Sequence, residues 1–576
     1  MLARLFAPIL VIASCGGLLA FAYHAAPGGD FARVGAWYSL IPPLLAMALA
    51  VLTRQLALSM ISSLIAAGIV VAYAQGAGPL ELAWHSTTFV SGAIFKVVSD
   101  PWSWRVAVFV MLILTMSSII ILAGGLIGVA QHLERYAKGP RSTQFVTFLL
   151  GISVFIDDYA STMIVGAAMR PLSDRHRISR EKLAFLVDAT SAPVAGLAVV
   201  STWIAFEVGL FERVSKDLNF GLNGYEMFFD AMSYRFYCLF LLLFMFIAIA
   251  SQRDFGPMLR AEKRSRLSGQ LIAPGAQPLT SSAYTLDKAH PQARPYARTA
   301  VVPLVLLLTV FVVGLWLSGG GFAIAAQDLS SLWRLSAWRE VLAHSSNSVV
   351  LLSATTTGLV SACYFALRVA RIPPALLWTA ARGGARNALL PMGILVLAWA
   401  LKQGFDATHL GDFLVHSVGD SIAPQWYPAL VFALGAAISF GIGTSWGTMS
   451  LLIPIVVPLA YTLDGNHYGL ITIICLGAVL DGAIFGDHCS PVSDTTIMSS
   501  IASACDHIDH VKTQLPYSLV VALVAFGAGY VPAAAGGSIW LSWGLALLSF
   551  TFIFLFVAKK TALHGQLAPV STIAGA

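Results

Sequence analysis

The sequence predicts an all-α polytopic membrane protein built from two inverted-topology repeats, each with a re-entrant hairpin and a broken helix. Three observations favour this fold class: a composition suited to lipid, apolar segments of spanning length, and a motif that recurs with its flanking charge reversed. Of the 576 residues, 57% are hydrophobic and only 11% are charged. Soluble domains carry about 25% charged residues. We therefore expect the lipid bilayer as the main partner, with no soluble domain at either end.

Apolar segments recur along the chain, and most are close to the ~20 residues that span hydrocarbon. They lie near residues 4–23, 36–53, 56–75, 104–130, 143–169, 183–207, 236–250, 299–318, 345–367, 388–402, 427–461, 469–505, 515–533 and 538–558. Lys and Arg gather in the short breaks between these segments and not on a face that could bind nucleic acid. The positive-inside rule thus accounts for the net charge of +6. It also predicts cytoplasmic termini in a bacterial-type inner membrane.

The first apolar segment leaves two interpretations open. The residues before Cys15 resemble a lipoprotein cleavage site, and Arg4 supplies the basic start of a signal sequence. Apolar sequence continues past Cys15, however, which favours an uncleaved first helix. The six cysteines lie mostly inside or beside apolar segments, so we expect no disulfide framework.

The chain divides into two halves around a polar segment with eight Lys or Arg and three Asp or Glu. The predicted parts are a first transmembrane half at 1–250 (hairpin 143–171, broken helix 183–207), a cytoplasmic linker at 251–298, and a second transmembrane half at 299–576 (hairpin 427–461, broken helix 469–505).

Two stretches of the first half recur, weakly, in the second half. The hairpin stretch reads DDYASTMIVGAAMRPL at 157–172 and TSWGTMSLLIPIVVPL at 444–459. The helix stretch reads VDATSAPVAGLAVVSTWI at 187–204 and LDGAIFGDHCSPVSDTTI at 480–497. The first hairpin is followed by the cationic SDRHRISREK, whereas the second is followed by AYTLDGNHYG, which has no Lys or Arg. By the charge rule the two copies face opposite sides, which is typical of inverted repeats in secondary transporters.

The length of the first hairpin arm predicts a turn inside the membrane. The 14 residue steps from Thr143 to Asp157 reach about 21 Å at 1.5 Å per residue, short of the ~30 Å hydrocarbon core. A re-entrant hairpin with FIDDY at its tip fits this length. In the second half, the glycines of 440–448 suit an unwound tip that exposes carbonyls. The first tip lacks such glycines.

The adjacent carboxylates Asp157 and Asp158 indicate a cation site. An ionised carboxylate at mid-membrane costs roughly 2.5–3.5 kcal/mol, and the two repel one another, so we expect one of them to carry a proton. A hard cation such as Na⁺ prefers oxygen ligands. Na⁺ and H⁺ would then compete for one site. The structural alternative is a pair of aspartates that cap helices at a buried turn.

The candidate ion- and proton-binding residues share a side-chain oxygen at a hairpin tip or a helix break, with Na⁺ expected at a subset of them. They are Asp157, Asp158, Asp188, Ser201, Thr202, Thr444, Ser445, Thr448, Asp481, Asp487, Ser490, Ser493, Asp494 and Thr495. Pro193 and Pro491 each remove a helix hydrogen bond and could free carbonyls nearby. We expect Glu207 to be a solvated carboxylate near the outer interface.

The run CDHIDH at 505–510 allows two interpretations. His507 and His510 have an i,i+3 spacing that is compatible with zinc. The run also precedes an apolar segment, where Asp and His can cap a helix or sense pH. We favour the second interpretation and expect neither a structural metal nor a cofactor.

At these motifs the sequence resembles the NhaC family of sodium/proton antiporters. The resembling stretches are FIDDY, VGAAMRPLSDRHRISREKLAFLVDATSAP, STW, LAWAL, GTSWGT, GAIFGDHCSPVSDTTIMSS and CDHIDHVKTQLPY. The resemblance implies hairpins and broken helices that meet at the midplane, an elevator-type movement, sodium efflux driven by proton entry, and a possible homodimer. Some relatives exchange organic acids such as malate and lactate. The chain departs from the family at Ser161, where Asn is expected, and at Lys402, where Gly is usual.

Two other functions compete with Na⁺/H⁺ exchange. The first is Na⁺- or H⁺-coupled transport of a small organic solute, such as malate, lactate or an amino acid. No Lys or Arg lies within the hairpin tips or broken helices, which disfavours an anion, although Lys402 or helix N-termini could assist one. The second is an intramembrane aspartyl protease. Six candidate aspartates in repeated motifs fit ion transport better, so we expect no enzyme activity.

Overall fold

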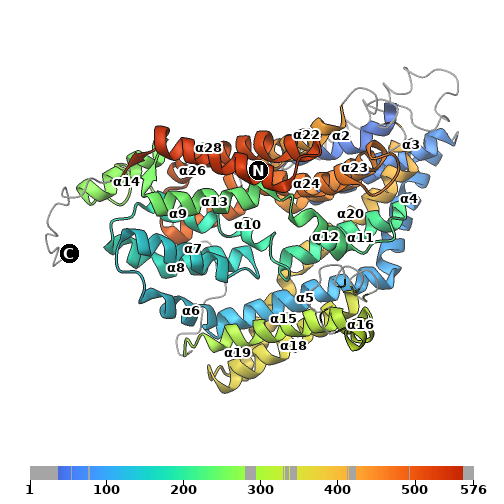
Figure 1. Cartoon of the computed structure of the whole chain (residues 1–576). Helices are drawn as coiled ribbons and strands as arrows, with labels where there is room; N and C mark the ends of the chain where they lie inside the picture. The colour runs from blue at the N-terminus through green and yellow to red at the C-terminus, as the bar shows by residue number, and fades with distance from the viewer. Residues whose placement is uncertain are drawn as a thin grey trace.

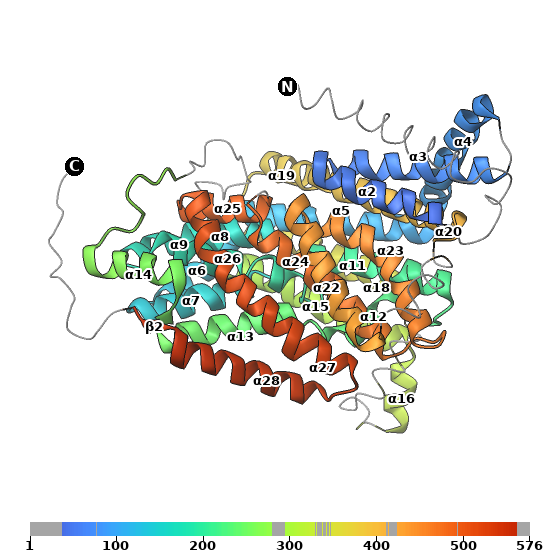
Figure 2. The ribbon, with the colours of Figure 1, turned by 90° about the horizontal axis from the view of Figure 1, so that it is seen from above.

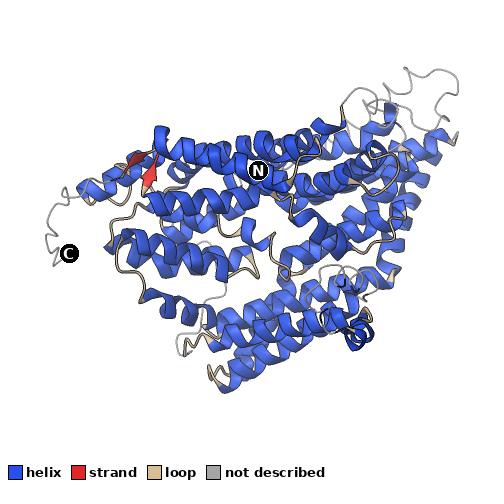
Figure 3. Ribbon diagram, viewed as in Figure 1, coloured by secondary structure: helices blue, strands red, loops and turns tan. Residues whose placement is uncertain are grey.

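The computed structural model describes residues 37–561, except 54, 76–77, 279–293, 329, 331–336, 338–340, 342–344, 346, 411–412, 414–422 and 492. The predicted segment at 4–23, its cleavage alternative and both chain termini lie outside the described residues. The described chain is helical apart from turns and one pair of short strands, as Figure 3 shows.

Helices of the first half include several that are too short to span a bilayer. In chain order the elements are η2 (Trp37–Leu40), α2 (Ile41–Thr53), α3 (Leu56–Ala74), α4 (Pro79–Ser99), α5 (Pro101–Leu122), α6 (Gly125–Glu134), α7 (Pro140–Ser153), α8 (Asp158–Arg175), α9 (Arg180–Asp188), α10 (Ala192–Ala195), α11 (Thr202–Leu218), α12 (Gly224–Met232) and α13 (Phe236–Ser251).

The remaining elements run from the linker to the end of the second half. They are β1 (Arg253–Asp254), α14 (Gly256–Ser268), α15 (Arg298–Ser318), α16 (Gly321–Gln327), α18 (Asn347–Arg368), α19 (Pro374–Asn387), α20 (Leu389–Ala407), η5 (Pro424–Trp426), α22 (Tyr427–Ile442), α23 (Ser445–Leu463), α24 (Leu470–Cys489), α25 (Asp494–Ser503), α26 (His507–Val524), the π-helical η6 (Ala525–Tyr530), α27 (Val531–Ala534), α28 (Ile539–Phe552), the π-helical η7 (Ile553–Val557) and β2 (Lys559–Lys560).

Ten helical stretches of the described chain are long and apolar enough to cross a membrane, so the protein is an integral membrane protein. The pair α12 and α13 passes the same test when taken together, with a bend of 44° between the two helices. The 21-residue α4 was missed by the sequence prediction. This helix contains Glu81, His85 and Lys96, so it is less apolar than the segments that the sequence predicted.

The helices are arranged in layers that run along a common direction. In Figure 1, α5, α15, α18 and α19 form the lower layer, and the contacts between these helices agree with the picture. The helices α22, α24, α26 and α28 lie along the upper side. Figure 2, the view from above, places α7, α8 and α9 toward the left end and α22 and α23 further right. The hairpin α7–α8 and the hairpin α22–α23 therefore lie toward opposite ends of the molecule.

The linker contains an ordered helix, which composition alone did not predict. Glu262 of α14 accepts hydrogen bonds from the backbone N–H and the hydroxyl of Ser179, each at 2.8 Å. Lys182 Nζ lies 2.6 Å from Asp254 Oδ1, and both side chains are buried. The strands β1 and β2 pair antiparallel, with Arg253 opposite Lys560. The linker thus holds the beginning of α9 through buried, compensated charges.

Helix α24 is the buried centre of the second half. Nearly all of its residues are buried, and α22 packs along it. Gly482 permits this approach, because a Cβ there would lie 2.5 Å from the carbonyl oxygen of Phe432. A side chain at this position would push two backbones apart.

We predict that Gly482→Ala lowers stability by about 1–3 kcal/mol, the usual cost of overpacking a core. The midpoint of thermal unfolding in detergent should fall. Gly544→Ala in α28 is the matched control, because no atom lies within 4 Å of its added Cβ. Equal unfolding midpoints for the two variants would contradict the close α22–α24 packing.

Candidate ion-binding site

The first hairpin tip rests on the break between α10 and α11. Asp157 caps α8, where its carboxylate accepts a hydrogen bond from the Ala160 N–H at 2.9 Å. The N–H of Thr202 donates to the Ile156 carbonyl at 2.8 Å, and the Thr202 hydroxyl lies 3.4 Å from Asp157 Oδ2. Asp157 is therefore a helix cap. Asp158 follows as the first residue of α8 and is only 4% exposed.

The second hairpin tip rests on the break between α24 and α25 in a similar way. Gly443 ends α22 with a φ of +76°, a conformation that glycine adopts easily. The Ser445 hydroxyl then donates to Asp487 Oδ2 at 2.7 Å, and the Ser493 hydroxyl donates to Asp487 Oδ1 at 2.6 Å. Thr495 Oγ1 lies 2.9 Å from Ser493 Oγ.

Four carboxylates come together where the two tips meet. Helices α8 and α25 pack against one another, and the Tyr159 hydroxyl donates a hydrogen bond to Asp494. Asp158 lies within electrostatic reach of Asp157, Asp487 and Asp494. The tips thus bring carboxylates from both halves into one cluster, which consists of Asp157, Asp158, Asp487 and Asp494 and is called the central cluster below. The first three are buried, whereas Asp494 is exposed.

Aromatic rings from both halves pack next to the central cluster. Trp446 of α23 stacks on Phe206 of α11, with 4.5 Å between ring centroids, and meets Trp203 edge to face. Trp203 also lies beside the Asp158 carboxylate. These rings come from α11 of the first half and α23 of the second, so the two halves also meet through aromatic packing.

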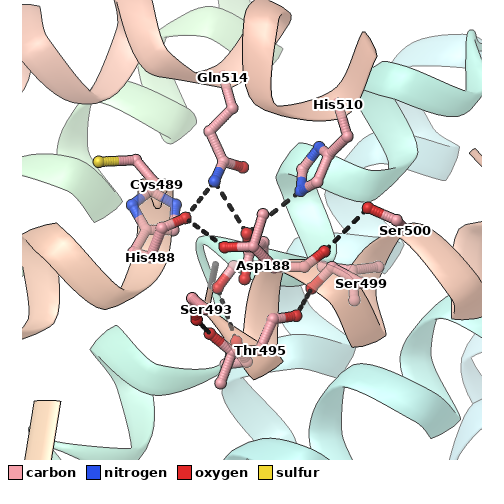
Figure 4. A network of polar contacts seen from close by, with 12 residues as sticks. Asp188, His488, Cys489, Ser493, Thr495, Ser499, Ser500, His510 and Gln514 are labelled. Carbon is pink, nitrogen blue, oxygen red and sulfur yellow. Dashed lines mark hydrogen bonds and ion pairs between the residues drawn. The ribbon is translucent and has the colours of Figure 1, made fainter. Parts of the chain in front are cut away.

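Asp188 belongs to a neighbouring network, which Figure 4 shows. Its Oδ2 accepts a hydrogen bond from Gln514 Nε2 at 2.8 Å and lies 3.2 Å from His510 Nε2. Gln514 also donates to the carbonyl of His488. The His488 ring is hydrogen-bonded to the Tyr237 hydroxyl at 2.9 Å. Asp188 is among the residues predicted from the sequence, whereas Gln514, Tyr237 and the contact of His510 with Asp188 are not.

Asp481 has different neighbours, although it aligns with Asp188 in the sequence. Arg235 Nε lies 2.8 Å from Asp481 Oδ1, and the Tyr530 hydroxyl donates to Oδ2 at 2.7 Å. The Tyr237 N–H donates to the same oxygen at 2.6 Å. Arg235 is 1% exposed, so this ion pair is buried.

The expectation for Glu207 is wrong. Its side chain is fully buried, and its Oε2 lies 3.6 Å from Arg235 Nη1. A carboxylate on an otherwise apolar stretch can pair with a distant arginine, and only the tertiary fold brings the two together. The signal that could have found the pair is the isolated Arg235 at the start of an apolar segment.

The other candidate hydroxyls mostly bond to the backbone. Ser201 caps α11 by accepting from the N–H groups of Trp203 and Ile204, each at 3.1 Å. The Thr448 hydroxyl donates to the Thr444 carbonyl at 2.9 Å, and Ser490 donates to the Phe440 carbonyl at 2.7 Å. Thr444 is the residue that precedes α23.

Two further hydroxyls were missed. Ser161 and Thr162 are buried on α8, three and four residues after Asp158, so they share its helix face. Neither hydroxyl has a hydrogen-bond partner within the described chain. Both are free to serve as cation ligands beside Asp158.

The CDHIDH run forms a helix start. Asp506 caps α26 by accepting from the N–H groups of Ile508 and Asp509. His507 is hydrogen-bonded to the Pro491 carbonyl at 2.8 Å, whereas His510 reaches Asp188. The two histidines therefore contact different partners. Within the part of the chain that the structure describes, no group of three His, Cys, Asp or Glu is placed to hold a metal.

Comparison with known proteins places this site in a transporter. A model of the Na⁺/H⁺ antiporter family matches residues 194–533, more than half of the chain. The chain belongs to the Na⁺/H⁺ antiporter family. This confirms the resemblance seen in the sequence. A member of this family is a membrane transporter and not an enzyme, so the aspartyl protease hypothesis is excluded.

Three relatives show how broad the similarity is. An uncharacterized protein of Haemophilus influenzae is 30% identical over 86% of this chain and 90% of its own length. The malate-2H(+)/Na(+)-lactate antiporter of Bacillus subtilis is 31% identical over 24% of this antiporter-family chain and 28% of its own. The arginine/ornithine antiporter ArcD of Halobacterium salinarum is 25% identical over 41% of each chain.

We predict that Arg235→Met destabilises the protein by about 3–5 kcal/mol, because it leaves the buried charge of Asp481 without its partner. Thermal unfolding in detergent measures the effect. The double variant Arg235→Met with Asp481→Asn should recover part of the loss, since the unpaired charge is then absent. An Arg235→Met variant as stable as the wild type would contradict this ion pair.

Proposed function

We propose that the protein exchanges Na⁺ for H⁺ across the membrane through the central cluster. The observation that carries this proposal is a group of four carboxylates, three of them buried, that has no positive partner among the described residues. Among the described residues, the ion pairs of Lys and Arg go to other acidic side chains. The three buried carboxylates cannot all be ionised in a low-dielectric site, since they repel one another. Bound cations or protons must neutralise them.

The oxygen atoms around the cluster suit Na⁺ and H⁺ as alternative occupants. Ser445, Ser493, Thr495 and Thr202 place hydroxyls beside the carboxylates, and hard cations favour oxygen ligands. When Na⁺ leaves, a proton can bind the same carboxylates, because it neutralises the same negative charge. Binding of one ion then displaces the other, which couples their movements.

The other aspartates have different roles in this proposal. Asp481 stays paired with Arg235 and holds α24 against α13. Asp188 borders the central cluster, and Gln514 and His510 fix the orientation of its carboxylate. We therefore assign the transported ion to the central cluster and positioning roles to Asp481 and Asp188.

The proposal includes two inverted repeats that move as an elevator. In support, the hairpin α7–α8 extends toward the left end in Figures 1 and 2, and the hairpin α22–α23 extends toward the right end. Each tip contacts the helix break of its own half. The layer of α5, α15, α18 and α19 would be the fixed scaffold. The tips and broken helices would carry the ions past it.

Coupled transport of an organic solute is the second candidate function. The names of two relatives support it, since one exchanges malate and lactate and another exchanges arginine and ornithine. In the part of the chain that the structure describes, no arginine or lysine pairs with the central cluster, so an anionic solute would need protons or Na⁺ as companions. Na⁺/H⁺ exchange needs no such addition and is the function that the geometry supports best.

We predict that Asp158→Asn reduces exchange to the level of protein-free vesicles, because the neutral amide cannot alternate between Na⁺ and H⁺. Proteoliposomes with an internal pH dye, given a Na⁺ pulse without organic solutes, report the exchange. Asp174→Asn is the control on the far end of α8, where the side chain is 29% exposed. Wild-type turnover in Asp158→Asn would remove this residue from the mechanism.

We predict that Ser445→Ala raises the Na⁺ concentration for half-maximal exchange about fivefold, from the loss of about 1 kcal/mol of hydrogen bonding and ligation. Ser450→Ala is the control on the same helix, because its hydroxyl donates only to the Trp446 carbonyl, at 2.8 Å. The initial rate of the dye signal against Na⁺ concentration gives both values. Equal values for the two variants would exclude Ser445 as a ligand.

A further inference from the structure

A second polar site lies away from the central cluster, where α11, α20 and α23 end. It is a cavity of about 330 Å³. The side chains used in the argument below are Asp217, Lys402, Asp406, Tyr461, Thr462 and Asn466. Figures 1 and 2 place these three helices beside one another toward the right end. The 16 residue steps of α23 from Ser445 to Tyr461 correspond to about 24 Å, so this cavity and the central cluster are separate.

Charge at the cavity is arranged around one buried lysine. The Lys402 side chain is 4% exposed and forms ion pairs with Asp406 and, at 3.5 Å, with Asp217 Oδ2. Asp406 remains 55% exposed and Asp217 27% exposed, so both carboxylates can accept further hydrogen bonds. Arg213 shares Asp217 at 3.7 Å, but it does not line the cavity.

The ends of three helices add partial negative charge at this cavity. Asp217, Asp406 and Tyr461 lie in the last turns of α11, α20 and α23. Helix C-termini carry partial negative charge. Two carboxylates and three helix ends thus surround one lysine. The excess of negative charge attracts an ammonium group, and the lysine can pair with a carboxylate.

We propose that this cavity binds a free amino acid. The α-carboxylate would pair with Lys402, and the α-ammonium group would pair with Asp406 and Asp217. Tyr461, Thr462 and Asn466 supply neutral polar groups at the rim, and prolines 454 and 458 with neighbouring apolar residues line the walls. The volume is at the small end of ligand sites, which span about 300–1,000 Å³, and so suits a ligand of this size.

The same charges select against dicarboxylates. Lys402 is the only Lys or Arg among the described residues that line the cavity. A second carboxylate of a ligand such as malate would therefore face Asp217, Asp406 or a helix C-terminus. The proposal concerns a site and ligand beyond the Na⁺/H⁺ exchange of the central cluster.

Calorimetric titration of the purified full-length protein in detergent tests the proposal, with alanine, ornithine and malate as ligands. Both amino acids should bind, and malate should bind at least about tenfold more weakly. Asp406→Asn should weaken binding of both amino acids about tenfold, because the exposed carboxylate is lost without burying a new charge. Glu81→Gln, an exposed acidic residue outside the cavity, is the matched control. Lys402→Gln should abolish the preference for amino acids over ethylamine.

Absence of binding by both amino acids, equal affinity for malate, or unchanged affinity in Asp406→Asn would each overturn the proposal. The Asp406 variant keeps the test valid if the buried Lys402 variant does not fold. The result is independent of Na⁺/H⁺ exchange, which the dye assay measures without amino acids. Either proposal can therefore fail while the other holds.

Discussion

Carboxylates that are buried without a positive partner in the described part of the chain are the constraint on which the site depends. Asp158 and Asp487 lie at helix breaks, where hydroxyls and the first residues of new helices replace regular backbone pairing. An ion or proton must supply the missing charge, since several buried carboxylates repel one another. The breaks in these helices are enclosed by other helices. This enclosure matters because irregular backbone inside a membrane is tolerated only where it is surrounded by protein or lines a cavity.

The two halves hold one another's aspartates. Asp188 of the first half contacts His510 and Gln514 at the start of α26, the helix that follows the second broken helix. Asp481 of the second half contacts Arg235, directly before α13, which follows the first broken helix with α12 between them. In each half, the aspartate of the broken helix contacts residues at the start of a helix of the other half, but the partner side chains differ. One aspartate has a permanent cation, and the other has an amide and an imidazole.

This difference separates structural from functional carboxylates. Asp481 pairs with the Arg235 guanidinium, which also lies 3.6 Å from Glu207, so the charge of Asp481 is compensated within the protein. The central cluster has hydroxyl donors and no such cation in the described chain. Removing a partner from a compensated pair costs stability, whereas under the proposed exchange removing a carboxylate from the central cluster costs ion binding. The linker adds a second group of compensated charges, in which Lys182 of α9 pairs with Asp254 of β1.

The sequence by itself determined the membrane environment, the helical class and the stretches that carry the acidic residues, because these follow from composition and from local spacing. It located the breaks near Asp157 and Gly443, since glycine, proline and paired aspartates act on their own backbone. Only the tertiary structure decided which aspartate meets which partner. Arg235 and Asp481 are far apart in the chain, and so are Tyr159 and Asp494. The linker helix α14 and the cavity at Lys402 also depend on packing between helices that no local pattern specifies. Long-range pairing of charges is a property of the assembled helices, and for that reason it could not be predicted from one sequence.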